Sequence, residues 1–210
     1  MMSLLPYKLY YQRNLPLFQP FDATMFITFR LVGSLPKAVM LKLDEAVRIK
    51  EDEVNQLTDP TIQKQAVTLA QKQLFSEWDA ALDAATESNR WLANPEVANI
   101  VCEALQYRDQ RVFSLDAYCV MPNHVHLVCT PLEDLTSTVT ISEIMHSLKG
   151  YTGHPANKLL SRQGQFWQPE SYDHVIQDHD DFIDVVNYVL ENPVRAGLPA
   201  RWTYLRDGIM

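Results

Sequence analysis

Between Thr24 and Leu31, near the start of the chain, apolar residues occupy every second position. A period of two, combined with β-branched and aromatic side chains, is typical of a strand with two distinct faces. We therefore predict a strand over residues 24–31. The alternating apolar residues are Met25, Ile27, Phe29 and Leu31.

Three helices are predicted between this strand and residue 110, because apolar residues there recur at helical spacing. Each run follows a start signal, either a side chain that can cap a helix or a proline suited to the first turn. The signals are Ser34 with Pro36, Asp59 with Pro60, and Asn94 with Pro95.

Two extended runs, Val112 to Val120 and His124 to Thr130, are separated only by Met121-Pro122-Asn123. Proline and asparagine between two strand-like runs are typical of a tight turn. The pattern predicts a hairpin. A further short strand or hairpin is predicted over Phe166 to Ile176, a stretch rich in aromatic residues.

Two more helices are predicted in the second half of the chain. Thr140 and Glu143 form a capping box ahead of one of them. Asp178 can cap the other, and Pro193 is expected to end it because proline cannot continue the hydrogen-bond ladder. The apolar stripe of this last helix consists of Phe182, Val185, Val186, Val189 and Leu190.

The order of these elements predicts an α+β fold with a mostly antiparallel sheet and helices packed on its faces. No repeat or linker divides the chain, so we expect a single domain over residues 1–210 with a helical insertion at about 36–93. This acidic insertion is either a partner-binding or regulatory element or a solvated helical hairpin.

The composition excludes several classes of protein. The chain has 210 residues, 47% of them hydrophobic, which is enough for a sizeable core. Cys102, Cys119 and Cys129 are odd in number and lack CxxC spacing, so no disulfide framework or zinc knuckle is indicated. No apolar run approaches the roughly 18 residues of a membrane span, and the start of the chain lacks a secretory signal pattern. We expect a cytoplasmic protein without a membrane partner.

The net charge of −8 argues against a generic nucleic-acid binder, because Lys and Arg make most phosphate contacts. The charge is uneven, however. Residues 37–110 hold 8 Lys or Arg against 13 Asp or Glu, whereas Ile144 to Pro169 holds Lys149, Lys158 and Arg162 and no acid. This basic stretch is either a phosphate-facing surface or a chance feature of a solvated face.

His124 and His126 flank Val125 within the second strand of the predicted hairpin. Side chains two residues apart on a strand point to the same face, so both imidazoles can reach one divalent ion. The triplet alone is a weak signal, since such pairs also occur as plain surface or core histidines.

Tyr188 and Asn192 lie four residues apart on the last helix, outside the centre of its apolar stripe. Residues at this spacing share one face of a helix, so a phenol and an amide oxygen can be presented together. A packing role for Tyr188, and a helix-ending role for Asn192 with Pro193, are the structural alternatives.

Four separated motifs occur in an order that resembles a known family. They are Met121-Pro-Asn-His-Val-His-Leu-Val, Phe166-Trp-Gln, Tyr172-Asp-His-Val-Ile and Tyr188-Val-Leu-Glu-Asn-Pro-Val-Arg-Ala-Gly-Leu. Together they resemble the REP-associated branch of the single-tyrosine HUH transposases, and the resemblance runs from Phe21 to Trp202. It implies a ferredoxin-like antiparallel sheet with helices packed on it.

The resemblance also implies a chemistry. His124, His126 and Asn192 would hold a divalent metal, magnesium or manganese, and Tyr188 would be the nucleophile that cuts single-stranded or hairpin DNA. The products would be a 5′-phosphotyrosine link and a free 3′-hydroxyl, which can rejoin strands without ATP. The resemblance leaves the oligomeric state open between a monomer and a homodimer.

Six residues are candidates for DNA contacts. Basic side chains can pair with phosphates, and aromatic rings can stack on bases. Solvated lysines and core aromatics are the alternative interpretations of the same residues. The candidates are Lys149, Lys158, Arg162, Trp167, Tyr172 and Arg195.

Two other functions remain open at this stage. A regulator of the same fold would bind DNA hairpins without cutting them, an idea favoured by the acidic composition. A metal hydrolase would use a metal-bound water, with Tyr188 in a structural role.

Overall fold

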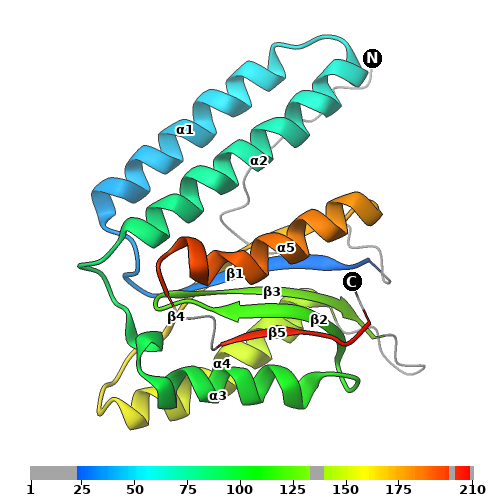
Figure 1. Ribbon diagram of the computed structural model, residues 1–210. Coiled ribbons are helices and arrows are strands. Elements are labelled where there is room, and N and C mark those ends of the chain that lie inside the picture. The colour runs from blue at the N-terminus through cyan, green and yellow to red at the C-terminus, as the bar shows by residue number, and fades with distance from the viewer. Residues whose placement is uncertain (1–22, 133–139, 199–201, 209–210) are drawn as a thin grey trace. The chain divides into compact units, whose positions relative to one another are not determined.

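The computed structural model describes residues 23–132, 140–198 and 202–208. In this part of the chain, five strands form one antiparallel sheet in the order β4-β1-β3-β2-β5 (Figure 1). The order of the first four strands is that of a ferredoxin-like sheet. The predicted α+β class with an antiparallel sheet is confirmed. The strands are β1 (Met25–Leu31), β2 (Phe113–Val120), β3 (His124–Pro131), β4 (Trp167–Val175) and β5 (Thr203–Leu205).

The predicted helix starts are confirmed except that Ser34 does not cap the first helix, whose N-cap residue is Pro36 and which lacks a side-chain cap. The Asp59 side chain accepts hydrogen bonds from two backbone N–H groups, Asn94 caps the next helix, and Thr140 with Glu143 forms a complete capping box. None of the helices in the described residues has the length and apolarity needed to cross a membrane. The helices are α1 (Lys37–Asn55), α2 (Pro60–Ala84), the 3₁₀ helix η1 (Trp91–Ala93), α3 (Pro95–Arg108), α4 (Ile141–Leu159) and α5 (His179–Arg195).

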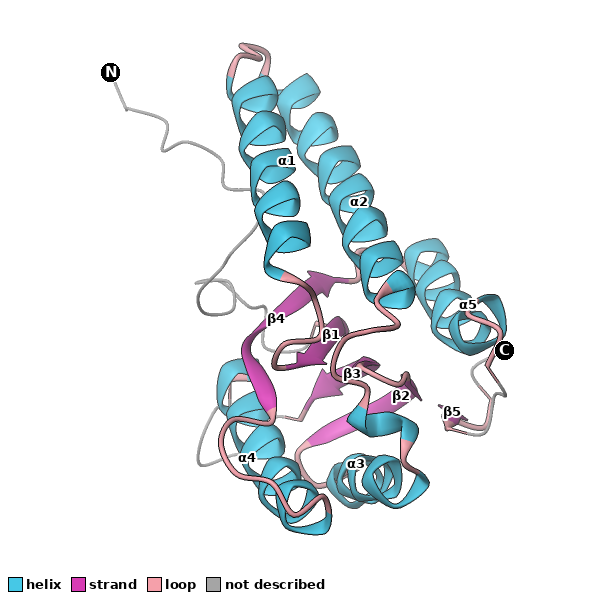
Figure 2. Ribbon diagram, turned by 90° about the vertical axis from the view of Figure 1, so that its left-hand side faces the viewer, coloured by secondary structure: helices cyan, strands magenta, loops and turns pink. Residues whose placement is uncertain are grey.

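The described chain divides into two compact units. One is the segment Leu35–Ser88, in which α1 and α2 lie side by side (Figure 2) and share an apolar cluster that includes Val54, Ala70 and Leu74. The other unit contains the sheet together with α3, α4 and α5. The description of the helical segment as an insertion into one domain stays a prediction.

The two faces of the sheet differ in chemistry. Alternate residues of β1 and β3, such as Ile27, Phe29 and Leu127, belong to the main apolar core, which α3 and α4 complete. Figure 1 shows these two helices on one side of the sheet and α5 on the other. Successive side chains of a strand point to opposite faces of the sheet. The remaining side chains of the central strands β1 and β3 therefore point toward the α5 side. These side chains include Phe26, Thr28, Arg30, His124 and His126.

Helix α5 passes through Pro193 and ends at Arg195, which corrects the expected stop at the proline. The end of the helix is set by Gly197, whose φ is +70°. Its N–H donates to the carbonyl of Val194 at 3.0 Å, and the N–H of Leu198 donates to the carbonyl of Pro193 at 2.7 Å. This pair of bonds is a Schellman motif, which glycine favours because it has no Cβ.

Two elements of the sheet unit are absent from the sequence prediction. The short helix η1 precedes α3, and β5 adds a three-residue strand beside β2. The ring of Tyr204 on β5 stacks on Tyr118 of β2 with centroids 5.5 Å apart. Elements this short carry too few residues for a period to be recognised.

Strand β4 contains a bulge near its start. Phe29 pairs with Ser171 and Leu31 with Trp167, so residues 168–170 lie opposite a single residue of β1. The Lys149 Nζ atom donates to the carbonyls of Gln168, Pro169 and Glu170 at 2.9 to 3.2 Å and to the Ser171 hydroxyl at 2.8 Å. Burial lowers the pKa of Lys149 to about 8. The ammonium group thus fixes the shape of the bulge.

Asp173, also on β4, allows the burial of its carboxyl group to be tested by a change of pH. Burial raises the pKa of its carboxyl group to about 7. The folded state therefore holds this proton more tightly than the unfolded chain, so the contribution of Asp173 to stability is greatest below about pH 4 and is lost as the pH rises to about 7. We expect Asp173→Asn to be more stable than the wild type by about 1–3 kcal/mol at pH 8, and by less at pH 5.

Denaturant unfolding at both pH values measures this difference. Asp184→Asn, which changes an exposed carboxylate on α5, is the control and should show no such dependence. A difference between Asp173→Asn and wild type that is the same at pH 5 and pH 8 would contradict the prediction.

Candidate metal and nucleophile site

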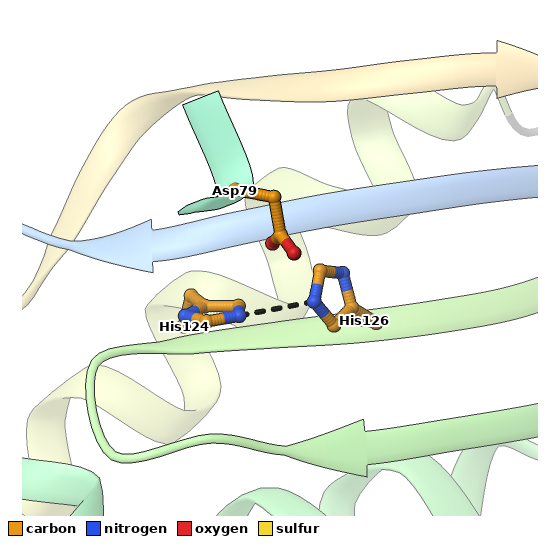
Figure 3. Close-up of side chains that lie close together, drawn as sticks. All are labelled: Asp79, His124 and His126. Carbon is orange, nitrogen blue, oxygen red and sulfur yellow. Dashed lines mark hydrogen bonds between the residues drawn. The ribbon is translucent and has the colours of Figure 1, made fainter. Parts of the chain in front are cut away.

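His124 and His126 lie side by side on β3, on the face opposite the main core. Both side chains are completely buried, and their Nε2 atoms are 3.0 Å apart (Figure 3). Val125 between them belongs to the main core on the other face. Asp79, which is also drawn there, belongs to α2 and so to the other unit.

The second nitrogen of each imidazole has a polar partner. His126 Nδ1 lies 2.7 Å from the hydroxyl oxygen of Thr28, which is directly opposite it on β1. His124 Nδ1 lies 2.7 Å from Oδ1 of Asn123, in the turn that precedes β3. Both rings are therefore held from their outer sides, an arrangement that is typical of histidine metal ligands.

The spacing of the two Nε2 atoms suits a divalent ion. Two neighbouring ligands of an octahedral ion, each about 2.1 Å from it, lie about 3.0 Å apart. The Nε2 atoms of His124 and His126 are separated by 3.0 Å. The pair can therefore supply two adjacent ligands without a change in its spacing.

Tyr188 on α5 lies against this pair. Its ring centroid is 5.5 Å from that of His126 and 6.0 Å from that of Phe26, with both contacts edge to face. Phe26 in turn stacks on His126 at 5.6 Å. The guanidinium carbon of Arg195 lies 4.9 Å from the centre of the Tyr188 ring. The phenol is thus half-buried between aromatic rings and a cation.

Asn192 lies one helical turn after Tyr188 and is completely buried. The spacing of four residues keeps both side chains on one face of α5. That face packs on the sheet, because α5 contacts β2 and β3. Since the helix continues past Pro193, Asn192 keeps a helical position and does not become part of an irregular end.

Two of the predicted DNA-contact residues lie in the same neighbourhood. Tyr172 on β4 is in register with Thr28, and its ring centroid is 6.2 Å from that of Phe26. Arg195 is exposed and covers one side of the Tyr188 ring. The structure therefore brings Tyr172, Tyr188 and Arg195 to the side of the sheet that carries Phe26 and His126.

Three other predicted contacts lie on α4 or just after it, on the opposite side of the sheet from the histidines (Figure 1). Lys158 is exposed. The Arg162 guanidinium lies 3.7 Å from the centre of the Trp91 ring and donates to the Gln165 carbonyl at 3.0 Å. Lys149 is engaged with the β4 bulge.

Trp167 requires a correction, because the expected base-stacking ring is a core side chain. It is 4% exposed and packs edge to face on Phe29 with centroids 4.8 Å apart. Its indole N–H donates to the Thr152 hydroxyl at 2.9 Å. A Cβ at Gly153 would lie 3.3 Å from the Cβ of the neighbouring Phe166, closer than an ordinary contact, so this glycine lets α4 approach closely.

Thr28 and Asn123 belong to the candidate site but are not among the residues that the sequence predicts for it. Asn123 stands next to His124 in the quoted motif, and Thr28 lies on the face of its strand that avoids the main core. Both were therefore visible as polar residues. What the sequence lacks is the register between β1 and β3, which places Thr28 opposite His126.

A family model described as "Transposase IS200 like" matches residues 86–192, which include both histidines, Tyr188 and Asn192. The matched segment is more than half of the chain. The chain therefore belongs to the family of IS200-like transposases.

Two known proteins are similar to this chain. A curated REP-associated tyrosine transposase of Haemophilus influenzae is 26% identical over 91 residues, which are 40% of this chain and 52% of that protein. The match thus spans about half of that relative. A solved structure of a REP-associated tyrosine transposase bound to a REP hairpin aligns over 90% of this chain and 76% of its own, with a TM-score of 0.51 and 16% identity. The resemblance predicted from the four motifs is confirmed.

The core position of Trp167 leads to a test that separates packing from DNA contact. Trp167→Ala should lower the free energy of unfolding by about 3–5 kcal/mol, because a large buried side chain is removed and its cavity does not close fully. Lys158→Ala, at an exposed site, should change it by less than about 0.5 kcal/mol. Urea unfolding measures both, and a Trp167→Ala protein as stable as wild type would show that this ring is not part of the core.

Proposed function

We propose that this protein is a metal-dependent transesterase of single-stranded DNA, which nicks and rejoins DNA at hairpin or repeat sequences through Tyr188. The observation that carries the proposal is the contact between the Tyr188 ring and His126, whose imidazole is paired with that of His124. A nucleophile beside a pair of metal ligands suits phosphodiester cleavage through a covalent intermediate.

The proposed reaction exchanges one ester bond for another. The Tyr188 Oη atom forms a bond to phosphorus, and the bond between phosphorus and the 3′ oxygen breaks. The phenol loses its proton during the attack, and the 3′ oxygen gains one as it leaves. The resulting 5′-phosphotyrosine retains an ester bond to phosphorus, so the free 3′-hydroxyl can attack it in reverse.

The residues around the phenol have distinct tasks in this proposal. The Arg195 guanidinium places a positive charge near the Tyr188 ring, where it favours the negative charge that develops on the phenolic oxygen. His124, His126 and Asn192 would hold a divalent cation, which supplies positive charge to the non-bridging phosphate oxygens. The spacing of the two Nε2 atoms supports this assignment, and manganese and magnesium are the candidate ions.

The DNA strand would approach beside α5, where Tyr172 and Arg195 flank Tyr188. Base stacking on Tyr172 and a phosphate contact to Arg195 suit a single strand. Lys158 and Arg162 lie on the other side of the sheet and would contact a more distant part of a hairpin. The REP hairpin in the similar solved structure supports hairpin DNA as the substrate class.

The test uses labelled single-stranded hairpins taken from repeats beside the gene, incubated with the full-length protein and either Mn²⁺ or EDTA. We expect Mn²⁺-dependent nicking and a covalent protein–DNA band on denaturing gels. Tyr188→Phe should lose both, by on the order of a thousandfold or more, because the nucleophile is removed. Tyr107→Phe, which changes an exposed tyrosine on α3, is the matched control and should retain both.

The other outcomes identify the competing functions. Tight hairpin binding without nicking would point to a regulator. Cleavage that survives Tyr188→Phe but is lost in His124→Ala would point to hydrolysis by metal-bound water. An adduct that forms with Tyr188→Phe would place the nucleophile elsewhere.

A further inference from the structure

A pair of side chains connects the first turn of α5 to strand β4. The Nε2 atom of His174 lies 2.8 Å from Oδ2 of Asp181, which is within hydrogen-bond distance. The same oxygen of Asp181 accepts from the backbone N–H of Gln177 at 3.2 Å. The two side chains are only 16% and 11% exposed. One carboxylate thus connects the strand, the loop that follows it and the helix.

Helix α5 can begin without this contact. The Asp178 side chain is the N-cap, and its Oδ1 atom accepts from the backbone N–H of Asp181 at 2.9 Å. Asp180, an exposed residue of the same turn, also places a negative charge near the helix N-terminus. What the Asp181 side chain adds is the contact with His174, which holds this turn against β4.

Asp181 and Tyr188 lie on the same face of α5. They are seven residues apart, which corresponds to about 700° of rotation, or two turns less about 20°. A contact made by Asp181 therefore fixes the rotation of the helix about its own axis at the angle that Tyr188 shares. Asn192, one turn further on, lies on this face as well. The direction of the phenol thus depends on what Asp181 contacts.

The strand end of the contact is tied to the same site. His174 is in register with Phe26 on the neighbouring strand β1. The Phe26 ring lies 6.0 Å from that of Tyr188 and 5.6 Å from that of His126, measured between centroids. A closed circuit of contacts therefore runs from β4 through Asp181 along α5 to Tyr188, and back through Phe26 to β4.

We propose that His174 and Asp181 are positioning residues, whose contact sets the placement of α5 on the sheet and thereby directs the Tyr188 phenol toward the scissile phosphate. This inference rests on the proposed role of Tyr188 as the nucleophile. Both residues act through Tyr188, without contact to the DNA. Their loss should therefore slow the chemical step and leave hairpin affinity unchanged.

The first experiment measures covalent adduct formation by the full-length protein with Mn²⁺ at saturating hairpin, and hairpin affinity separately in EDTA. His174→Ala and Asp181→Ala should each slow adduct formation about 10- to 100-fold, because a small displacement of a nucleophile is costly. Hairpin affinity should stay within a few-fold of wild type. The double variant should be no slower than the slower single variant, since both changes remove one contact.

Two further variants separate positioning from other effects. His174→Gln keeps a side-chain N–H donor at the end of a side chain of similar reach, and it should restore adduct formation to within a few-fold of wild type. Asp180→Ala is the matched control, because it removes a first-turn carboxylate that is exposed, and it should react like wild type. An equal loss in Asp180→Ala and Asp181→Ala, or unchanged rates in His174→Ala and Asp181→Ala, would overturn the proposal.

A second experiment reads the placement of α5 without DNA or metal. Nuclear Overhauser contacts between the ring protons of Tyr188 and Phe26 should weaken in His174→Ala and persist in His174→Gln. Contacts between Phe29 and Trp167, in the main core, should persist in both and show that the protein is folded. Tyr188 contacts that are unchanged in His174→Ala would contradict the inference.

The two proposals can fail separately. A wild-type protein that binds hairpins but forms no adduct would remove the proposed function, and with it the catalytic consequence of this contact. Adduct formation that is normal in wild type and unaffected in His174→Ala would remove only the inference.

Discussion

The contact between two buried imidazole rings constrains the rest of the sheet unit. Polar nitrogens that are removed from water must find partners, since an unmatched buried donor or acceptor costs about 1–3 kcal/mol. His124 and His126 meet this requirement through each other and through side chains on β1 and in the β2–β3 turn. The register of the central strands is therefore coupled to the chemistry of the site.

One face of the sheet carries the apolar core, and the other carries the candidate site. The face toward α3 and α4 carries the apolar core, and its packing gives the strands a rigid base. The other face carries the imidazoles and is met by α5, which supplies Tyr188 and Asn192. Because the same strands serve both faces, a site built on them inherits the rigidity of the core.

Much of the fold follows from local sequence signals. Caps such as Asp59 and Asn94, and the alternation in residues 24–31, act over a few residues and can be recognised without a structure. The sequence-based prediction fails where the outcome depends on residues outside the local signal. Pro193 has the local signature of a helix end, yet Gly197, four residues later, decides where α5 stops. The sequence leaves open whether Trp167 stacks on DNA or packs in the core, because Phe29 and Thr152, which pack against it, are distant along the chain.

The bulge held by Lys149 also affects what can happen at the edge of the sheet. An edge strand usually offers a row of backbone groups to which another chain can add. In β4, the carbonyls of residues 168–170 turn toward the ammonium group of Lys149 instead. A strand arriving from another molecule would find no regular ladder along this stretch, so the sheet has a defined end at β4 and is protected there from growing by edge-to-edge aggregation.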